Sequence, residues 1–395
     1  AELERLSPKT AKALYGKNIF SSVSRLERFA GCPFSFFAEY GLKAEERRLY
    51  QLNTPDLGSL FHEVLELFSN KLEQDSLSWT SLTKEETTAR IHAAVEDAAP
   101  RLGNRILLDS AANQYLIRRL KRISTRAAWT LVQHLQQGDF VPAGYEVGFG
   151  AHEALPPIVI RLQDGGSLIL NGKIDRVDLL DANGTRYVKI IDYKSGNKTF
   201  HFQDIYYGLQ LQLLVYLDAY LKYYKKTGAS FKPGGVFYFR ITDPTLALDE
   251  ELSAEAIEKI LYEKMRMSGL LLQEDVLIHG LDHSLAESRS SAIVPVGYTK
   301  KGDPTAASNL ATEEQYAAIL DFVATRTQEI GDAMKAGIIT PAPYRDGQRT
   351  PCSYCSYRSL CRHSYGEAPR WRKLKKIDKA DFWESITPKQ PTETE

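Results

Sequence analysis

The sequence predicts an α/β fold in which helices flank a mixed sheet, with helical insertions and a cysteine-bearing terminal region. Apolar residues recur at helical spacing over most of the first 138 residues, and short β-rich runs joined by Gly, Asp and Asn turns follow over 144–196. Helical patterns return on both sides of a further strand at 234–241. With 395 residues, 43% of them hydrophobic, the chain can bury a sizeable core.

The elements follow one another in a clear order. A helical segment over 21–50 opens with Ser capping residues and is interrupted by Cys32 and a proline. The remaining predictions are a helix over 56–75, helical pattern over 81–138, strands within 144–150, 157–181 and 186–196, a helix over 204–226, a strand over 234–241, helices over 251–275 and 312–337, and a polar loop over 280–310. The last segment, 338–395, carries clustered cysteines, a basic stretch and a tail that we expect to be partly disordered.

The composition limits the class of protein. Fifty basic and fifty acidic residues cancel, so only the local distribution of charge can indicate a nucleic-acid partner. No apolar run approaches about 18 residues, so we expect no membrane span. The first residues lack a signal pattern and an initiator Met, which predicts a soluble cytoplasmic protein and suits a fragment of a longer one.

Two acids end neighbouring β-like segments. Asp175 and Asp192 each follow an Ile, and the turn at "DANGT" would make their strands antiparallel neighbours with converging carboxylates. Such a pair repels unless a cation lies between, and oxygen ligands of this kind suit Mg²⁺ or Mn²⁺. Lys194 lies on the same strand face as Asp192, where an ammonium can orient a water or neutralise charge on a phosphate transition state.

A lone D-x-K is more often an ordinary ion pair at a strand end, but two further features favour a site. His62 lies four residues after Gly58 on an amphipathic helix and could complete a metal shell, although a lone His there is more often a packing residue. Gln212 and Tyr216 share one helix face, for which helix packing is the alternative interpretation.

Taken in order, these elements resemble the RecB-type branch of the PD-(D/E)xK nuclease superfamily. That pattern is G-x-x-x-H, a strand ending in I-D, then D-x-K and Q-x-x-x-Y, and it matches Gly58–His62, Ile174–Asp175, Asp192–Lys194 and Gln212–Tyr216. The resemblance implies a PD-(D/E)xK (restriction-endonuclease-like) core and a Mg²⁺-dependent (or Mn²⁺-dependent) exodeoxyribonuclease.

The resemblance also implies a role for each matched residue. The metal ligands would be His62, Asp175, Asp192 and the Tyr193 carbonyl; Lys194 would be catalytic together with the two aspartates, and Gln212 and Tyr216 would shape the site and contact DNA. For the nearby acids Glu66 and Asp178, salt bridging is the simpler role.

The four cysteines form a one-plus-three pattern. Cys352, Cys355 and Cys361 are spaced C-x2-C-x5-C, and Cys32 lies far upstream, which favours a metal clip over disulfides. Spacing alone allows zinc or an iron–sulfur cluster. The layout is similar to the iron–sulfur staple of AddB-type nucleases, shared by CRISPR-associated RecB-like exonucleases, and implies a structural [4Fe-4S] cluster, with a redox role left open.

The resemblance covers about residues 20–365 and implies one nuclease domain over 1–395. Its parts would be a cysteine-bearing helical segment (20–50), the nuclease core (51–245), a helical insertion (246–337), the cluster segment (338–365) and a basic tail (366–395). AddB-type chains are second subunits of bacterial helicase–nucleases, so the resemblance implies an AddA-type partner in a heterodimer. It also implies degradation of the 5′-ended single strand in recombinational double-strand break repair.

Two other functions stay open. One is a nuclease-fold protein that binds or scaffolds DNA without activity, against which the intact His-Asp-Asp-Lys set argues. The other is a free-standing CRISPR-associated exonuclease.

A basic helix face is the candidate DNA contact. Arg118, Arg119 and Arg122, with Lys121 and Arg126, lie within about two turns. Such a run is usually a solvated face, but beside a nuclease site it can bind phosphates.

Overall fold

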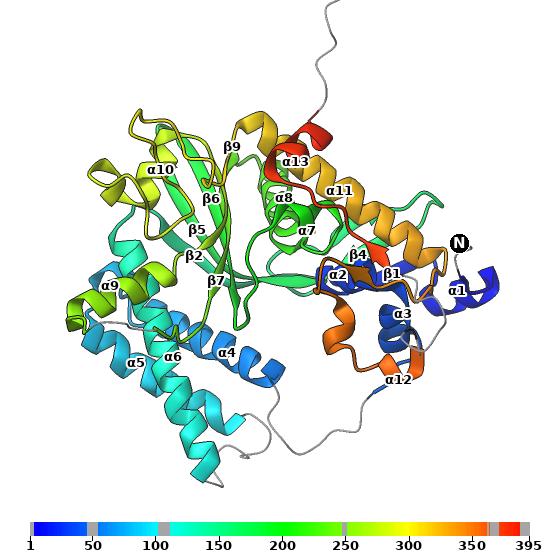
Figure 1. Ribbon diagram of the computed structural model, residues 1–395, viewed down its shortest axis with the longest axis horizontal. Helices are drawn as coiled ribbons and strands as arrows, with labels where there is room; N and C mark the ends of the chain where they lie inside the picture. Colours follow the sequence, from blue (N-terminus) through cyan, green and yellow to red (C-terminus); the bar gives the residue numbers. More distant parts are fainter. Residues whose placement is uncertain are drawn as a thin grey trace, which may run out of the picture.

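A six-stranded mixed sheet with the strand order β2-β5-β6-β7-β8-β9 lies at the centre of the molecule (Figure 1). The computed structural model describes residues 4–45, 54–101, 111–246, 251–361, 363 and 371–387. The strands of this sheet are β2 (Val141–Phe149), β5 (Gly172–Ala182), β6 (Thr185–Lys194), β7 (Phe231–Arg240), β8 (Ser268–Leu272) and β9 (Leu310–Ala311). The pairs β6–β7 and β8–β9 are parallel and the other three are antiparallel, so the predicted mixed sheet is confirmed.

Two smaller sheets tie distant segments together. In the first, β4 (Ser167–Leu170) pairs with both β1 (Asn18–Ser21) and β3 (Ile158–Arg161), which anchors the N-terminal segment to the middle of the chain. In the second, β10 (Tyr344–Arg345) pairs with β11 (Arg372–Lys373).

Helices cover both sides of the central sheet (Figure 1). One group lies beside β2 and the lower part of the sheet: α4 (Thr54–Gln74), α5 (Lys84–Ala98), α6 (Ala111–Gln136) and α9 (Ala254–Lys264). The other group includes α2 (Val23–Gly31), α7 (Phe202–Tyr206), α8 (Gln212–Lys226), α11 (Glu313–Lys335) and α13 (Lys379–Ile386). The remaining helices are α1 (Pro8–Tyr15), α3 (Pro33–Phe36), α10 (Asp275–Leu281) and α12 (Arg358–Cys361), with a π-helical turn η1 (Phe37–Gly41) and 3₁₀ turns η2 (Trp79–Ser81), η4 (His283–Ala286) and η5 (Pro351–Tyr354).

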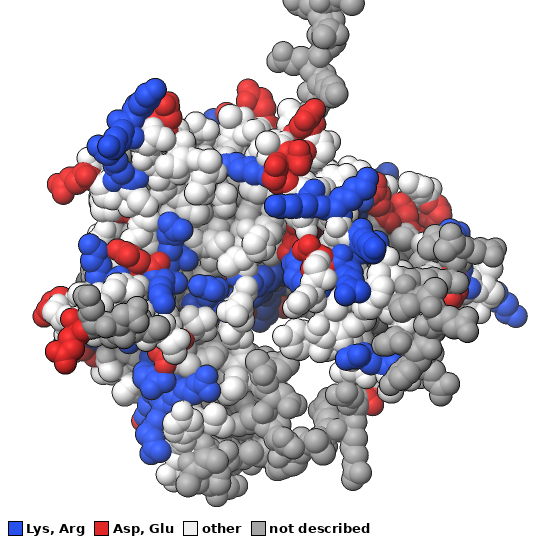
Figure 2. Space-filling view, in the orientation of Figure 1, with Lys and Arg blue, Asp and Glu red and all other residues white. Residues whose placement is uncertain are grey.

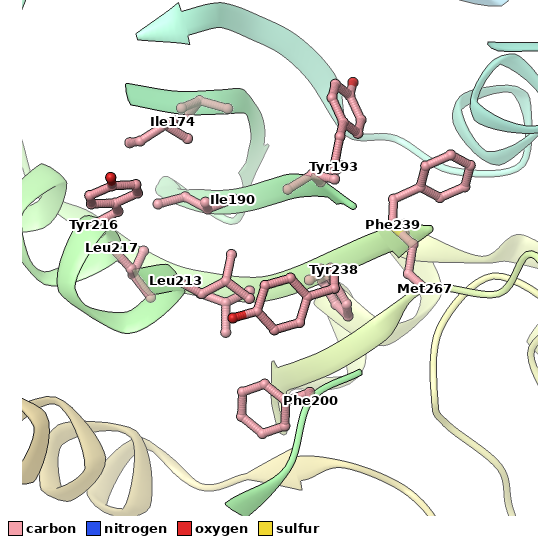
Figure 3. Packing of buried hydrophobic residues seen from close by; sticks show 14 of the residues in the cluster. Ile174, Ile190, Tyr193, Phe200, Leu213, Tyr216, Leu217, Tyr238, Phe239 and Met267 are labelled. Carbon is pink, nitrogen blue, oxygen red and sulfur yellow. The ribbon is translucent and has the colours of Figure 1, made fainter. Parts of the chain in front are cut away.

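The sheet and its helices share one hydrophobic core. Figure 3 shows Tyr193 and Phe239 on one side of the central strands and Tyr238, with Leu213 of α8, on the other. Burial of such large side chains on both faces fixes the register of β6 and β7.

Several predicted elements differ from the observed ones. The helix predicted over 204–226 is broken between α7 and α8, because Gly208 takes a left-handed conformation with φ 73°. The helix predicted over 251–275 ends at Lys264, and Ser268–Leu272 form β8 instead. Since β8 and β9 belong to the central sheet, the segment 246–337 is wrongly described as a helical insertion.

The described part of the C-terminal tail is ordered rather than free. Within it, α13 buries Phe382 against the rest of the chain, although we expected partial disorder over 366–395. The basic stretch "RWRKLKK" contributes β11, and the Arg372 guanidinium donates a hydrogen bond to the carbonyl of Ala30. The positions 366–370 and 388–395 of this tail lie outside the described residues.

Candidate active site

A tight hairpin brings the two predicted aspartates together. Strands β5 and β6 are joined through Asn183 and Gly184, whose φ angles of 51° and 75° suit the two central positions of such a turn. The ladder ends where Arg176 pairs with Ile191, which places Asp175 and Asp192 side by side just beyond it. Both carboxylates are buried, and Asp175 Oδ2 accepts a 2.6 Å hydrogen bond from the backbone N–H of Tyr193. The predicted convergence of the two acids is therefore confirmed.

The imidazole of His62 reaches this pair from α4. Its Nδ1 lies 3.3 Å from Asp175 Oδ2, and its ring meets the edge of the Tyr193 ring with 6.0 Å between centroids. Burial alone would lower the pKa of His62, but the hydrogen bond and charge of Asp175 outweigh it and raise that pKa. His62 and Asp175 thus belong to one charge cluster, as predicted.

Glu146 of β2 completes the cluster, and the sequence analysis missed it. Its φ of 47° is unusual for a residue with a side chain, and it lies opposite Asp175, between the pairs Tyr145–Arg176 and Val147–Ile174. Ligand atoms of His62, Glu146 and Asp175 all lie within 4.8 Å of one another. An acid inside the otherwise apolar run "GYEVGF" was the available signal.

Crowding of carboxylates perturbs the Glu146 side chain. Burial, followed by the charges of Asp175 and Glu66, raises its pKa to about 7. A cavity of about 570 Å³, lined by His62, Glu66 and Glu146 among others, opens against these groups. The cluster is therefore accessible from outside on the α4 side.

Lys194 and Asp192 form the other half of the site. Lys194 Nζ lies 2.5 Å from Asp192 Oδ2 and donates a 3.3 Å hydrogen bond to Gln212 Oε1. Burial and then the charge of Asp175 raise the pKa of Asp192 to about 6, although Lys194 opposes that rise. Tyr193 lies between them in sequence, so strand alternation turns its ring to the opposite face of the sheet, and Figure 3 shows this ring on the other side of the strands from Tyr238.

Helix α8 supplies the remaining predicted residues. Gln212 is its first residue, and Tyr216 follows one turn later with its ring stacked on Phe149 at 5.6 Å between centroids. A Cβ atom at position 172 would overlap the Tyr216 hydroxyl, so Gly172 leaves room for that ring beside the hairpin. Gln212 contacts the site directly and Tyr216 fills the space beneath it.

The donor set fits a divalent cation. His62, Glu146 and Asp175 form the tightest part of the set, with Asp192 beside Asp175 and with Lys194 and Lys173 as neighbouring cations. Oxygen-rich sets of this kind suit Mg²⁺ or Mn²⁺. Asp192 Oδ2 is buried and paired with Lys194, while the charge of Asp175 repels it. Buried acids that repel one another are groups that a metal ion would stabilise.

The cysteines form a second group, distant from the first in sequence. Cys32 is buried at the end of α2, where Gly31 packs against Pro351, and Cys355 Sγ lies 4.0 Å from Ser35 Oγ. Burial and the neighbouring thiols of Cys352 and Cys355 raise the pKa of Cys32 to about 11. Burial and the charges of Cys355 and Cys361 likewise raise the pKa of Cys352. The structure thus brings the one-plus-three pattern into one place.

The predicted basic face lies on α6, where Lys and Arg side chains gather in Figure 2. Arg118 and Arg119 are exposed, whereas Arg122 lies 2.5 Å from Asp243 and is partly neutralised. Arg118 and Arg122, but not Arg119, line a cavity of about 670 Å³, and Trp129 lines it too. Among the described helices, α6 included, none carries a long enough apolar run to cross a membrane.

The match to known proteins agrees with this geometry. A sequence profile of the PD-(D/E)XK nuclease superfamily matches residues 21–362. The chain belongs to the PD-(D/E)XK nuclease superfamily. The predicted family is therefore confirmed, and the hairpin with Asp175, Asp192 and Lys194 lies within the matched range.

Curated relatives, each named as one subunit of an ATP-dependent helicase/deoxyribonuclease, extend the match along nearly the whole chain. The chain is 42% identical over 388 residues to the relative from Alkaliphilus oremlandii, covering 98% of this chain and 34% of that protein. The corresponding protein of Alkaliphilus metalliredigens is 44% identical over 362 residues, with 91% and 31% covered. That of Caldanaerobacter subterraneus subsp. tengcongensis is 39% identical over 361 residues, with 91% and 31% covered. This PD-(D/E)XK chain spans about a third of the length of these relatives.

Proposed function

We propose that this chain is the nuclease part of a helicase–nuclease, a Mg²⁺-dependent or Mn²⁺-dependent exonuclease that hydrolyses a single DNA strand delivered by a helicase. The observation that carries the proposal is the convergence of His62, Glu146 and Asp175, with Asp192 and Lys194 beside them. The names of the relatives, which describe a subunit of an ATP-dependent helicase/deoxyribonuclease, support the same function.

The metal would be held by His62, Asp175 and Asp192 with the Tyr193 carbonyl, and Glu146 adds a carboxylate to that set. When bound, a divalent cation supplies Lewis acidity and a lowered pKa for a coordinated water. The backbone N–H of Tyr193, by donating to Asp175, fixes the orientation of one carboxylate before any ligand arrives.

Lys194 would stabilise negative charge on the phosphate under attack. Its ammonium is held between Asp192 and the Gln212 side chain, so its position is set before DNA binds. Burial lowers its pKa, but Asp192 outweighs burial and raises it, which keeps the ammonium charged. Gln212 and Tyr216 would shape the place where the strand lies.

The DNA strand would extend from this site toward α6. The backbone N–H of Ile241 donates to the Lys194 carbonyl at 2.8 Å, and Asp243, two residues further on, pairs with Arg122 of the basic face. Arg118, Arg119 and Arg122 would contact phosphates there.

The strand degraded would be the 5′-ended one, in recombinational repair of double-strand breaks, with an AddA-type subunit as the heterodimeric partner.

For the cysteines we propose a structural [4Fe-4S] cluster. Cys32, Cys352, Cys355 and Cys361 are drawn from segments that the fold brings together, and the resemblance to AddB-type nucleases favours a four-iron cluster, which binds each thiolate to a different iron. Zinc is the alternative occupant of four thiolates. Iron and sulfide analysis of the purified protein, with its visible absorbance, tests this assignment.

The decisive experiment is Asp192→Ala in the purified chain, assayed with Mg²⁺ on an end-labelled single-stranded oligonucleotide. We expect hydrolysis to be abolished while DNA binding persists. Asp181→Ala is the matched control, since Asp181 lies in the same hairpin and makes an exposed ion pair with Arg186. Retention of metal-dependent activity in Asp192→Ala would show that the site assignment is wrong. Binding without hydrolysis in the unaltered chain would favour a non-catalytic role instead.

A further inference from the structure

Glu27 links the cysteine-bearing segment to the nuclease site. It lies on α2, which ends at Gly31 just before Cys32, and its carboxylate is mostly buried, with 14% of the side chain exposed. One oxygen, Oε1, accepts hydrogen bonds from the backbone N–H groups of Leu211 at 2.8 Å and Gln212 at 3.1 Å. The other, Oε2, accepts from Lys198 Nζ at 3.1 Å.

This carboxylate caps the helix that carries Gln212. The residue before α8 is Leu211, whose apolar side chain makes no capping hydrogen bond. The first N–H groups of a helix need acceptors from elsewhere, and a negative charge is favoured there by the helix dipole. Glu27 of α2 therefore supplies the capping acceptor that the sequence just before α8 lacks. It also fixes the position of Gln212, the first residue of α8.

The position of the first turn of α8 affects Lys194 through Gln212. Gln212 Oε1 accepts the hydrogen bond from Lys194 Nζ, so a shift of the first turn of α8 would move that acceptor. Lys198, which Glu27 also binds, lies near the same surface as Lys194. The ammonium groups of Lys194 and Lys198 lie 5.9 Å and 5.3 Å from the centre of the Tyr238 ring, and Tyr238 pairs with Asp192 across the sheet.

We propose that Glu27 is a positioning residue of the nuclease site, which transmits the placement of the cysteine-bearing segment to Lys194 through the start of α8 and holds Lys198 beside it. The inference rests on the proposed nuclease function. It assigns to α2 a role in setting catalytic geometry in addition to carrying Cys32, because one carboxylate joins α2, the start of α8 and the loop after β6.

The test compares Glu27→Ala with Glu27→Gln in the full chain. Glu27→Ala removes the cap, so we expect kcat on single-stranded DNA to fall by about 10²-fold while KM changes by less than about threefold. Hydrogen exchange at the amides of Leu211 and Gln212 should speed up in the same variant. Glu27→Gln keeps an amide oxygen as acceptor, so it should restore slow exchange and bring kcat to within about tenfold of the unaltered protein.

Glu39→Gln is the matched control, because Glu39 follows α2 closely and pairs with Arg28 but not with α8. It should leave kcat and both amides unchanged. Unaltered kcat in Glu27→Ala would overturn the proposal, and so would an equal fall in Glu39→Gln, which would indicate general loosening of this segment. If instead Asp192→Ala remains active, it is the nuclease assignment that fails, so the two failures are distinguishable.

Discussion

Strand β6 carries two lysines in opposite situations. Lys189 is buried on one face, with its Nζ 2.9 Å from Asp178 Oδ2. Lys194 lies on the other face at the strand end, beside Asp192, with 23% of its side chain exposed. Both lysines lie on β6 and each pairs with an aspartate. The difference between the two ion pairs therefore lies in the residues that surround them.

The buried cluster holds one acid between two cations. Arg176 and Lys189 both contact Asp178, with the Arg176 guanidinium paired to both carboxylate oxygens at 2.6 and 2.9 Å. Burial alone would raise the pKa of Asp178, but Arg176 and Lys189 outweigh it and lower that pKa. The guanidinium also lies over the Trp79 ring, 4.8 Å from its centre. The salt-bridging role predicted for Asp178 is confirmed.

The cluster at the strand end has the opposite balance. Burial and repulsion among the acids outweigh the lysines near Glu146 and Asp192, and the pKa values of these two acids rise to about 7 and about 6. An excess of buried acid is costly to the folded chain unless a cation binds. The comparison teaches that an acid on this sheet is structural where two cations surround it, and that it points to a cationic ligand where acids crowd together.

The largest expected effect on stability is at Asp178. Asp178→Asn leaves Arg176 and Lys189 buried without a counter-charge, so we expect the free energy of unfolding to fall by about 3–5 kcal/mol. Urea unfolding measures it, and Asp181→Asn at the exposed end of the same hairpin should leave the midpoint unchanged. A small loss at Asp178 would mean that the buried cluster is not self-contained.

At Lys194 the expected effect is on activity. Lys194→Gln should lower kcat by about 10²–10³-fold, because it removes the cation aimed at the developing charge. Stability should fall less than at Asp178, because Lys194 is partly exposed and Asp192, whose pKa is already raised to about 6, can take up a proton when its counter-charge is gone. Parallel kinetics and urea unfolding separate the two quantities, and a large stability loss with modest kinetic change would place Lys194 with Lys189 as a structural residue.

Glu146→Gln should have an intermediate effect. We expect Mg²⁺ or Mn²⁺ affinity to fall by about 10–100-fold while a saturating metal concentration recovers much of the activity, because His62 and the two aspartates remain. Isothermal titration with Mn²⁺ measures this affinity. Unchanged affinity would remove Glu146 from the donor set.

The smallest effect concerns pH. The folded-state pKa values of Glu146 and Asp192 lie above those of unfolded acids, so the folded protein binds protons more tightly and metal-free stability falls as pH rises through about 4–7. Mg²⁺ relieves the repulsion only once the acids are ionised. The rise in melting temperature on adding Mg²⁺ should therefore be larger at about pH 8 than at about pH 5.5, equivalent to about 1–2 kcal/mol. An equal rise in melting temperature at the two pH values would show that Glu146 and Asp192 do not take part in binding the metal.

Much of this site was predictable because its ligands sit on local patterns. An Asn-Gly turn between two alternating runs specifies a hairpin, and the hairpin fixes the register that joins Asp175 to Asp192. Gln212 and Tyr216 follow from helical spacing in the same way. These positions needed no knowledge of the rest of the fold.

The unpredicted parts depend on contacts distant in sequence. Glu146 faces the site because β2 pairs with β5 and bends at a positive φ, which no local pattern indicates. The segment Ser268–Leu272 suits the end of a helix equally well, and it becomes a strand because β7 offers it an edge. Glu27 acts on α8 only once the whole chain has folded.

The hairpin turn at Asn183 and Gly184 also bears on how the site forms in time. Hairpins close in about 1–10 μs, whereas contacts that join distant segments wait for the rest of the chain. Asp175 and Asp192 therefore meet early, before His62, Glu146 or Cys32 can reach their places. At that stage the hairpin brings the two carboxylates together without their later neighbours, so their mutual repulsion opposes its closure until other groups arrive.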